Sequence, residues 1–288
     1  MIVSKFGFMD TSISNGKRFL AGGTTNRFYL FDVESNQLLL KLNAGYYPQF
    51  IQNDKYLLLV KNNGEFQVFD YMNHEIFLKR KLPNKMEMLS PTFCWTEKNI
   101  IYFETYKSIP GQETPFWVLI KYDMTTDEFS CRDHKRAMVG SWKEYLVFCN
   151  NIAADDEPIN SALRFYQDDN LCKEIVIGET QTVFIVDNRL YVIKNEKREI
   201  RIYEYLEDFS CERIFSIRDK QRFAYGDIFS ISEKYIAIYK RDHIMVYMRE
   251  TNQLVFDQDI PYVMNVTLLE DKIYIGAMDK LYMFNLNE

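Results

Sequence analysis

The stretch Phe28-Tyr29-Leu30-Phe31 is the first of seven copies of one short pattern: an apolar residue, any residue, a second apolar residue, then Phe or Tyr. The copies recur at intervals of 37 to 53 residues along the whole chain. The other six are Phe66–Phe69, Leu119–Tyr122, Leu163–Tyr166, Ile200–Tyr203, Ile244–Tyr247 and Leu281–Phe284. A period of this length indicates a repeat architecture, in which each unit buries its apolar face by stacking on its neighbours.

Each copy lies inside a longer unit that reads as four strands. An apolar strand precedes every copy, and alternating stretches such as Gln49–Gln52 and Gln37–Leu42 lie on either side. The strands just before the seven copies begin at Phe19, Tyr56, Ile100, Tyr145, Leu190, Tyr235 and Ile273. Four short strands joined by tight turns form a β-meander, and seven such units in series predict a seven-bladed β-propeller. We therefore expect an all-β fold of four-stranded antiparallel blades.

The two ends of the chain complement each other. After Phe284 only four residues remain, so the seventh unit lacks its fourth strand. Residues Ile2–Phe6 alternate like a strand and precede the first complete unit. We predict that this N-terminal strand supplies the missing one and closes the ring.

Composition favours one folded domain over residues 1–288. The chain has 47% hydrophobic and 16% aromatic residues, and no Pro-, Ser- or Gly-rich linker interrupts the repeat. The net charge of −6 with scattered Lys and Arg argues against nucleic-acid binding, which needs a concentrated basic face. Only Lys79-Arg80-Lys81 with Lys85 approaches such a face, on a predicted outer strand. No run of eighteen apolar residues occurs, so we expect no membrane span and a cytoplasmic protein.

The five cysteines are Cys94, Cys131, Cys149, Cys172 and Cys211, and none forms a Cys-x-x-Cys pair. Zinc sites and disulfide frameworks show clustered or paired spacing. We therefore expect reduced thiols that pack as small hydrophobic residues.

At the end of the third strand of several units, an aromatic residue is followed by Asp, as in Phe31-Asp32, Phe69-Asp70 and Tyr122-Asp123. This slot resembles the one that WD-repeat proteins fill with Trp-Asp. The run Asp32–Leu38, with its Asp-x-x-x-x-Gln-Leu spacing, is similar to quinoprotein-like propellers. No unit carries the Gly-His pair of WD repeats or the Trp-bearing quinoprotein signature. The resemblance implies the fold, and it carries over no functional residue.

The chain shows no pattern typical of catalysis. There is no Gly-x-Ser-x-Gly elbow and no Gly-rich phosphate loop before a helix, and the three histidines fall in predicted turns or strand ends. We expect no metal and no cofactor. An alternative stays open, in which a lactonase-like or glycosidase-like enzyme, or a small-molecule or carbohydrate receptor, uses the central channel. Its candidate carboxylates are Glu87, Glu179 and Asp227, in loops that lead into inner strands.

The remaining signal is surface shape. The loops within 104–116 and 150–161 are longer than their counterparts in the other units. Loops of this kind and the connections between blades share one end of a propeller, and these connections are rich in aromatic residues, which dominate the energetic centres of interfaces. We predict a monomeric, non-catalytic scaffold or adaptor that binds a protein partner there. The candidate partner-binding residues are Tyr46, Tyr47, Phe116, Trp117, Trp142, Arg222, Phe223, Tyr225 and Tyr262.

Overall fold

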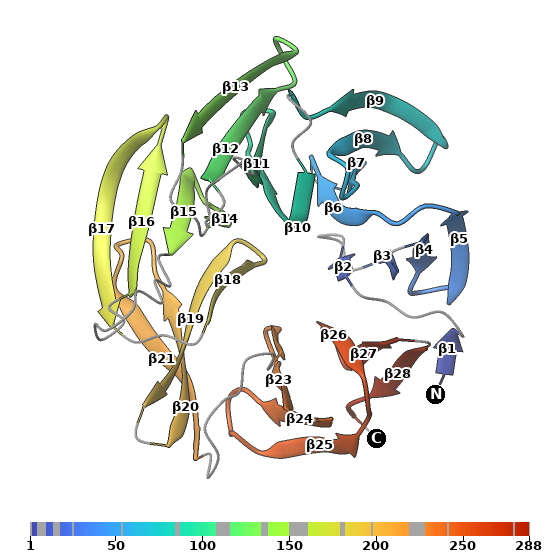
Figure 1. Ribbon diagram of the computed structural model, residues 1–288. Coiled ribbons are helices and arrows are strands. Elements are labelled where there is room, and N and C mark those ends of the chain that lie inside the picture. The colour runs from blue at the N-terminus through green and yellow to red at the C-terminus, as the bar shows by residue number, and fades with distance from the viewer. Residues whose placement is uncertain are drawn as a thin grey trace. The chain divides into compact units, whose positions relative to one another are not determined.

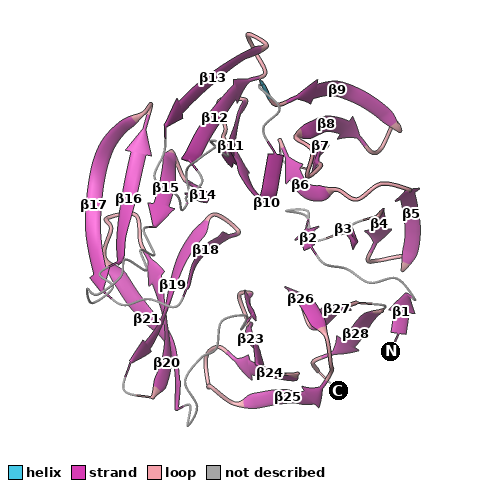
Figure 2. Cartoon of the chain, viewed as in Figure 1, coloured by secondary structure: helices cyan, strands magenta, loops and turns pink. Residues whose placement is uncertain are grey.

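The structure is a computed structural model, and its regular elements are all strands (Figures 1 and 2). It describes residues 2–4, 10–13, 18–24, 26–52, 54–83, 87–107, 116–133, 138–149, 161–178, 182–196, 198–218, 228–240, 242–278 and 280–287. The 28 strands form seven four-stranded antiparallel sheets, and no α-helix occurs within these ranges. The predicted fold class, a seven-bladed β-propeller of four-stranded blades, is confirmed.

The described chain divides into two compact units, which we treat separately. Unit 1 comprises Met1–Lys61, Glu65–Lys81 and Phe223–Glu288, and unit 2 comprises Asn62–Gly64 and Leu82–Arg222. The expectation of a single domain over residues 1–288 stays a prediction. Each blade is named below by its strands.

Unit 1 holds four blades. The first two contain β2 (Asp10–Ile13), β3 (Phe19–Thr24), β4 (Arg27–Asp32) and β5 (Gln37–Leu42), then β6 (Tyr47–Ile51), β7 (Tyr56–Val60), β8 (Glu65–Asp70) and β9 (Glu75–Lys81). The last two contain β22 (Ile228–Ile231), β23 (Tyr235–Lys240), β24 (His243–Met248) and β25 (Leu254–Asp259), then β26 (Val263–Leu269), β27 (Lys272–Ala277), β28 (Leu281–Asn285) and β1 (Ile2–Ser4).

Unit 2 holds the other three blades. Their strands are β10 (Glu87–Trp95), β11 (Ile100–Lys107), β12 (Phe116–Asp123) and β13 (Glu128–Asp133); β14 (Met138–Trp142), β15 (Tyr145–Cys149), β16 (Ser161–Gln167) and β17 (Asn170–Gly178); and β18 (Thr182–Val186), β19 (Arg189–Glu196), β20 (Glu199–Tyr205) and β21 (Cys211–Arg218). All seven copies of the repeated pattern lie on the third strand of their blade.

The N-terminal strand completes the last blade, as predicted. β1 pairs antiparallel with β28, Ile2 lying opposite Tyr282 and Ser4 opposite Leu281, and the sheet order is β1-β28-β27-β26. The first and last strands of the chain therefore share one sheet. Without β1, the backbone groups on the outer side of β28 would have no strand partner.

The core consists of apolar clusters, each shared by neighbouring blades. In unit 1, Ala21, Phe28 and Leu30 of one blade pack with Leu57 and Leu59 of the next. Other clusters join the β22–β25 blade to β26 and β27, and join β27 and β28 to β3 and β4. In unit 2, similar clusters join successive blades. Second strands such as β7 and β23 are buried on both faces, which explains the near-continuous apolar sequence of Tyr56–Val60.

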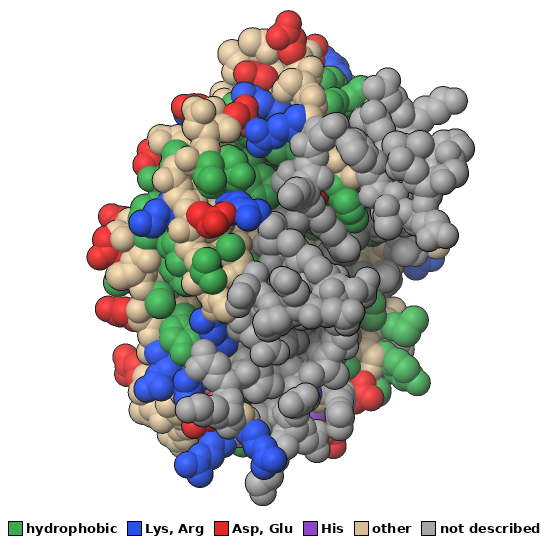
Figure 3. Space-filling view, turned by 60° about the vertical axis from the view of Figure 1, so that its left-hand side comes forward, with side chains coloured by type: hydrophobic (Ala, Val, Ile, Leu, Met, Phe, Trp, Pro, Cys, Tyr) green, Lys and Arg blue, Asp and Glu red, His purple; other side chains and the backbone are tan. Residues whose placement is uncertain are grey.

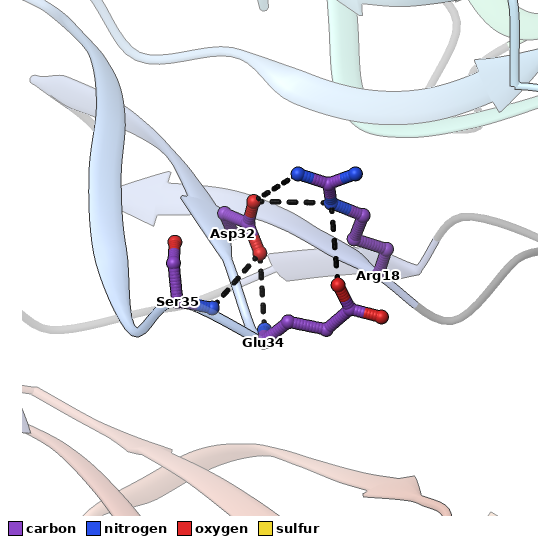
Figure 4. A network of polar contacts seen from close by, with 4 residues as sticks. All are labelled: Arg18, Asp32, Glu34 and Ser35. Atoms are coloured by element: carbon purple, nitrogen blue, oxygen red, sulfur yellow. Dashed lines mark hydrogen bonds and ion pairs between the residues drawn. The ribbon is translucent and has the colours of Figure 1, made fainter.

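The Asp of each aromatic-Asp pair stabilises the turn that follows the third strand. The rings of Phe31 and Tyr122 are buried, and the Asp that follows each folds the chain toward the outer strand. The Asp32 carboxylate accepts hydrogen bonds from the backbone N–H groups of Glu34 (3.0 Å) and Ser35 (3.2 Å) (Figure 4). The carboxylates of Asp70 and Asp123 accept the equivalent pairs of bonds. The motif behind the resemblance therefore has a structural role in these three blades.

The cysteines follow the expectation only in part. All five are free thiols, but only Cys94 and Cys149 are buried. Burial raises the pKa of the Cys94 thiol to about 12 and that of Cys149 to about 11. The exposed three, Cys131, Cys172 and Cys211, lie on outer strands, which are covered on fewer sides. The expectation that every cysteine packs as a small hydrophobic residue was wrong for these three.

Candidate partner-binding surface

Several of the predicted partner-binding residues lie outside the part of the chain that the structure describes. These are Arg222, Phe223 and Tyr225, together with the side chain of Phe116. The central parts of the two long loops, 108–115 and 150–160, also lie outside it. The same holds for the carboxylates of the alternative channel site, Glu179, Asp227 and the side chain of Glu87.

Trp142 belongs to the core rather than to a binding surface. Its side chain is 1% exposed and packs against the rings of Phe165 (5.6 Å between centroids) and Phe209 (6.0 Å). A ring with almost no exposed area cannot make contact with a partner, so the prediction of Trp142 as a contact residue is corrected. Its position at the end of an inner strand did not reveal that a turn from the next blade covers it.

Tyr46, Tyr47 and Trp117 are each half-buried. The Tyr46 ring meets the edge of Phe28 at 6.2 Å, and the Lys61 ammonium lies 5.3 Å from its centroid. Lys61 in turn pairs with Glu65 at 2.9 Å, and this hydrogen bond is the main reason that the pKa of Lys61 is raised. Tyr46 is therefore fixed in place with only part of its ring available to a partner.

Tyr262 is the predicted residue with the greatest exposure. It follows Pro261 in the connection between β25 and β26, and its side chain is 70% exposed. Its backbone φ is 57°, in the left-handed region that few non-glycine residues adopt. A tyrosine held in this conformation indicates that the surrounding structure fixes the turn.

Asp242 provides that support. Its carboxylate accepts hydrogen bonds from the Tyr262 backbone N–H (3.2 Å) and from the Tyr239 hydroxyl (2.9 Å). Its carbonyl oxygen accepts a bond from the Ile260 backbone N–H at 2.8 Å. Burial, followed by the bond to Asp242, raises the pKa of Tyr239, so this hydroxyl stays a donor at neutral pH. The connection is therefore attached to the preceding blade on both sides of Pro261.

Two exposed methionines lie beside Tyr262. Met278 is 66% exposed, and its backbone N–H donates to the Tyr262 carbonyl oxygen at 3.3 Å. Met264 is 38% exposed and lies at the irregularity in the pairing of β26 with β27. We call Tyr262, Met264 and Met278 the Tyr262 patch. The analysis of the sequence missed both methionines, although Met278 in a hairpin turn next to Asp279 was a signal, since turns seldom expose large apolar residues.

The polar groups of the β22–β25 blade include a histidine between two carboxylates. His243, the first residue of β24, lies between Asp257 and Asp259 of β25, with each ring nitrogen 2.7 Å from a carboxylate oxygen. Across the described residues, no group of three or more His, Cys, Asp or Glu side chains is placed to hold a metal ion. The face of the molecule in Figure 3 carries acidic, basic and hydrophobic side chains interspersed with one another.

Comparison with known proteins supports the architecture alone. No family model matches the chain, and no curated protein matches it in sequence. Among solved structures, it is similar to the β-propeller domain of Cps50 (Swd1) from Myceliophteria thermophila, with a TM-score of 0.65 and 12% identity over 99% of this chain and 98% of that one. In all, 1182 solved chains match. A likeness so widely shared confirms the propeller and selects no function. No helix within the described ranges is long and apolar enough to cross a membrane.

Proposed function

We propose that this chain is a non-catalytic scaffold or adaptor that binds a protein partner through the blade connections that carry Tyr262. The observation that supports this most strongly is the Tyr262 patch. A tyrosine with 70% of its side chain exposed stands on a turn fixed by Asp242, with two exposed methionines beside it. Rigid aromatic side chains bury a large area at a small entropic cost, and Tyr and Met are both enriched in interfaces.

The exposed parts of Tyr46, Tyr47 and Trp117 extend the proposed contact set. We retain Phe116, Arg222, Phe223 and Tyr225 as proposed contacts, by reason of their sequence positions, and we omit Trp142. A cytoplasmic location and a monomeric state before binding complete the proposal. In this view the propeller supplies rigid connections, and the chemistry of recognition lies in the side chains that they present.

The test starts with a partner identified by affinity purification from the native organism and mass spectrometry. Binding of that partner is then measured for wild type, Tyr262→Ala and Met278→Ser. Loss of an energetic centre costs about 2 kcal/mol or more, so we expect Tyr262→Ala to raise the Kd roughly 30-fold. Met72→Ser is the matched control, because Met72 is also exposed but lies in the turn before an outer strand. Its Kd should be unchanged.

All variants should melt at the wild-type temperature, since the replaced side chains are exposed. Unchanged binding in Tyr262→Ala, with loss of binding in variants of Lys79 or Arg80 on β9, would place the site on the outer strand and refute the proposal.

A further inference from the structure

A cleft lies between the β10–β13 blade and the β14–β17 blade, both in unit 2. It opens where the turns 96–99, 143–144 and 168–169 lie side by side. Its inner part is lined by Tyr102, Tyr145 and Tyr166, together with Ile100 and Leu146. An outer part continues past Tyr102 and Asp169 toward β13. We call the two parts together the Tyr102 cleft.

Tyr102 lies at the junction of the two parts of this cleft. Its side chain is buried, with the residue 7% exposed, and it lines both parts of the cleft. Burial, followed by the nearby Asp169 carboxylate, raises the pKa of its phenol to about 12, so the group carries its proton. Within the described part of the chain, this hydroxyl has no hydrogen-bond partner. The Tyr102 ring packs in the core, while its hydroxyl opens on the cleft, where it can accept a hydrogen bond from a bound group.

The charges around the inner part do not balance. Lys98 pairs with Asp168 at 2.5 Å, and Arg132 pairs with Asp169 at 3.1 Å. Lys143 pairs with Glu207, which is outside the cleft lining. Two lining carboxylates then have no cationic partner among the described residues: Glu97, and Glu144, which accepts a hydrogen bond from the Gln167 amide at 3.0 Å.

The outer part has the opposite excess. Lys121 lines it, and no ion pair to this lysine is found in the described structure. The site for a cation is therefore the inner part, between Tyr102 and the two carboxylates. The packing of the Arg132 guanidinium over the Tyr166 ring, 6.0 Å from its centroid, shows that a tyrosine wall of this cleft accepts such a group.

We propose that the inner part of the Tyr102 cleft binds an arginine side chain of a peptide segment on a partner protein. The tyrosine walls cover the aliphatic stem, the Tyr102 hydroxyl accepts a guanidinium N–H, and Glu97 and Glu144 balance the positive charge. Arginine fits better than lysine because its planar guanidinium stacks on rings and donates in several directions. The site is separate from the Tyr262 patch, so either assignment can fail without the other.

The test uses a capped peptide, acetyl-Gly-Arg-Gly-amide, titrated into the isotopically labelled full chain. The backbone amide signals of Lys98, Glu144 and Asp169 report on binding. A second peptide replaces arginine with citrulline, which keeps the shape and loses the charge. A third arm uses butylguanidinium alone, which separates a site for a peptide side chain from one for a free small cation.

We expect saturable shifts with the arginine peptide, weaker binding of butylguanidinium and no binding of the citrulline peptide. Tyr102→Phe and Glu97→Gln should each weaken the arginine peptide about 3-fold, the size expected for one hydrogen bond or one partly exposed charge pair. Lys98→Met should strengthen binding, because it frees the Asp168 carboxylate. Glu128→Gln, which removes an exposed carboxylate outside the cleft, should leave binding unchanged.

Equal binding of the citrulline peptide would overturn the proposal, as would the absence of saturable shifts at these three amides. Equal weakening by Glu128→Gln and Glu97→Gln would show attraction to overall charge and would also overturn it. If butylguanidinium binds as tightly as the arginine peptide, the ligand of the cleft is a small cation, and the proposal of a protein segment is rejected. A variant that only destabilised the fold would bind the arginine peptide more weakly. The tighter binding expected for Lys98→Met therefore distinguishes a direct effect on the site from a loss of stability.

Discussion

At the scale of single residues, Asp32 shows how one carboxylate connects two strands. It is 3% exposed, accepts two backbone N–H groups of the turn after β4, and pairs with Arg18, whose nitrogens lie 2.8 Å and 3.0 Å from it (Figure 4). The hydrogen bond from Arg18 is the largest cause of the lowered pKa of Asp32, and the turn N–H groups add to it. The ionised form is therefore the one that the folded state favours.

This pKa shift gives a pH prediction with a definite sign. A carboxylate whose pKa is lower in the folded state stabilises the fold above the pKa of the unfolded chain, near 4. That contribution is lost as the pH falls through the lower, folded-state pKa. Asp32→Asn should therefore lower the free energy of unfolding at pH 7 by about 1–2 kcal/mol and reduce its dependence on pH below about 4. Urea denaturation of both proteins at pH 7 and pH 3 measures these free energies of unfolding. If wild type and Asp32→Asn differ by the same amount at both pH values, the role given to Asp32 is contradicted.

The cysteines give a second prediction at this scale. A thiol reacts as its thiolate, and burial raises the pKa values of Cys94 and Cys149 far above neutral pH. Titration of the native protein without reductant should therefore label three thiols quickly, those of Cys131, Cys172 and Cys211. Denaturation should raise the count to all five. A total of three or one after denaturation would reveal disulfides and exclude the reducing location that we propose.

At the scale of elements, the decisive strand is β1. Removing residues 2–6 should leave β28 as an unpaired edge and lower the melting temperature by several degrees, since each kcal/mol lost shifts a domain of this size by roughly 2 °C or more. Calorimetry of the full and truncated chains measures the shift. A synthetic peptide of residues 1–6 should restore part of the lost stability by pairing with β28. An unchanged melting temperature in the truncated chain would show that β1 adds nothing.

The sequence predicted strands well because burial constrains them strongly. The first residue of every copy of the pattern, such as Phe28 or Ile244, is buried on the third strand of its blade, so the pattern recurs wherever that environment does. The position of β1 was predicted because the last unit lacks a fourth strand, and not from the weak alternating pattern of β1 itself. The exposure of an individual side chain was harder to predict. Trp142 is covered by Phe209 from the next blade, a contact that no local pattern encodes. Met264 and Met278 were missed because their exposure depends on how two connections meet.

At the scale of the whole molecule, the fold and the function rest on different kinds of observation. The seven blades and the structural likeness to Cps50 (Swd1) define a framework that supports many activities. The functional proposal depends instead on the Tyr262 patch, and the arginine site depends on the Tyr102 cleft. An enzyme or receptor that uses the channel would instead need its carboxylates to meet at one point, and this was the alternative that the sequence left open.

The most direct test of the proposed function is site-specific photo-crosslinking in cells of the native organism. A photoreactive phenylalanine analogue replaces Tyr262 in one chain and Phe77 in another, because Phe77 is also exposed but lies on the outer strand β9. We predict that the chain labelled at position 262 crosslinks to one discrete protein, and that the chain labelled at position 77 does not. Crosslinking from position 77 with none from position 262 would contradict the assignment of the binding surface.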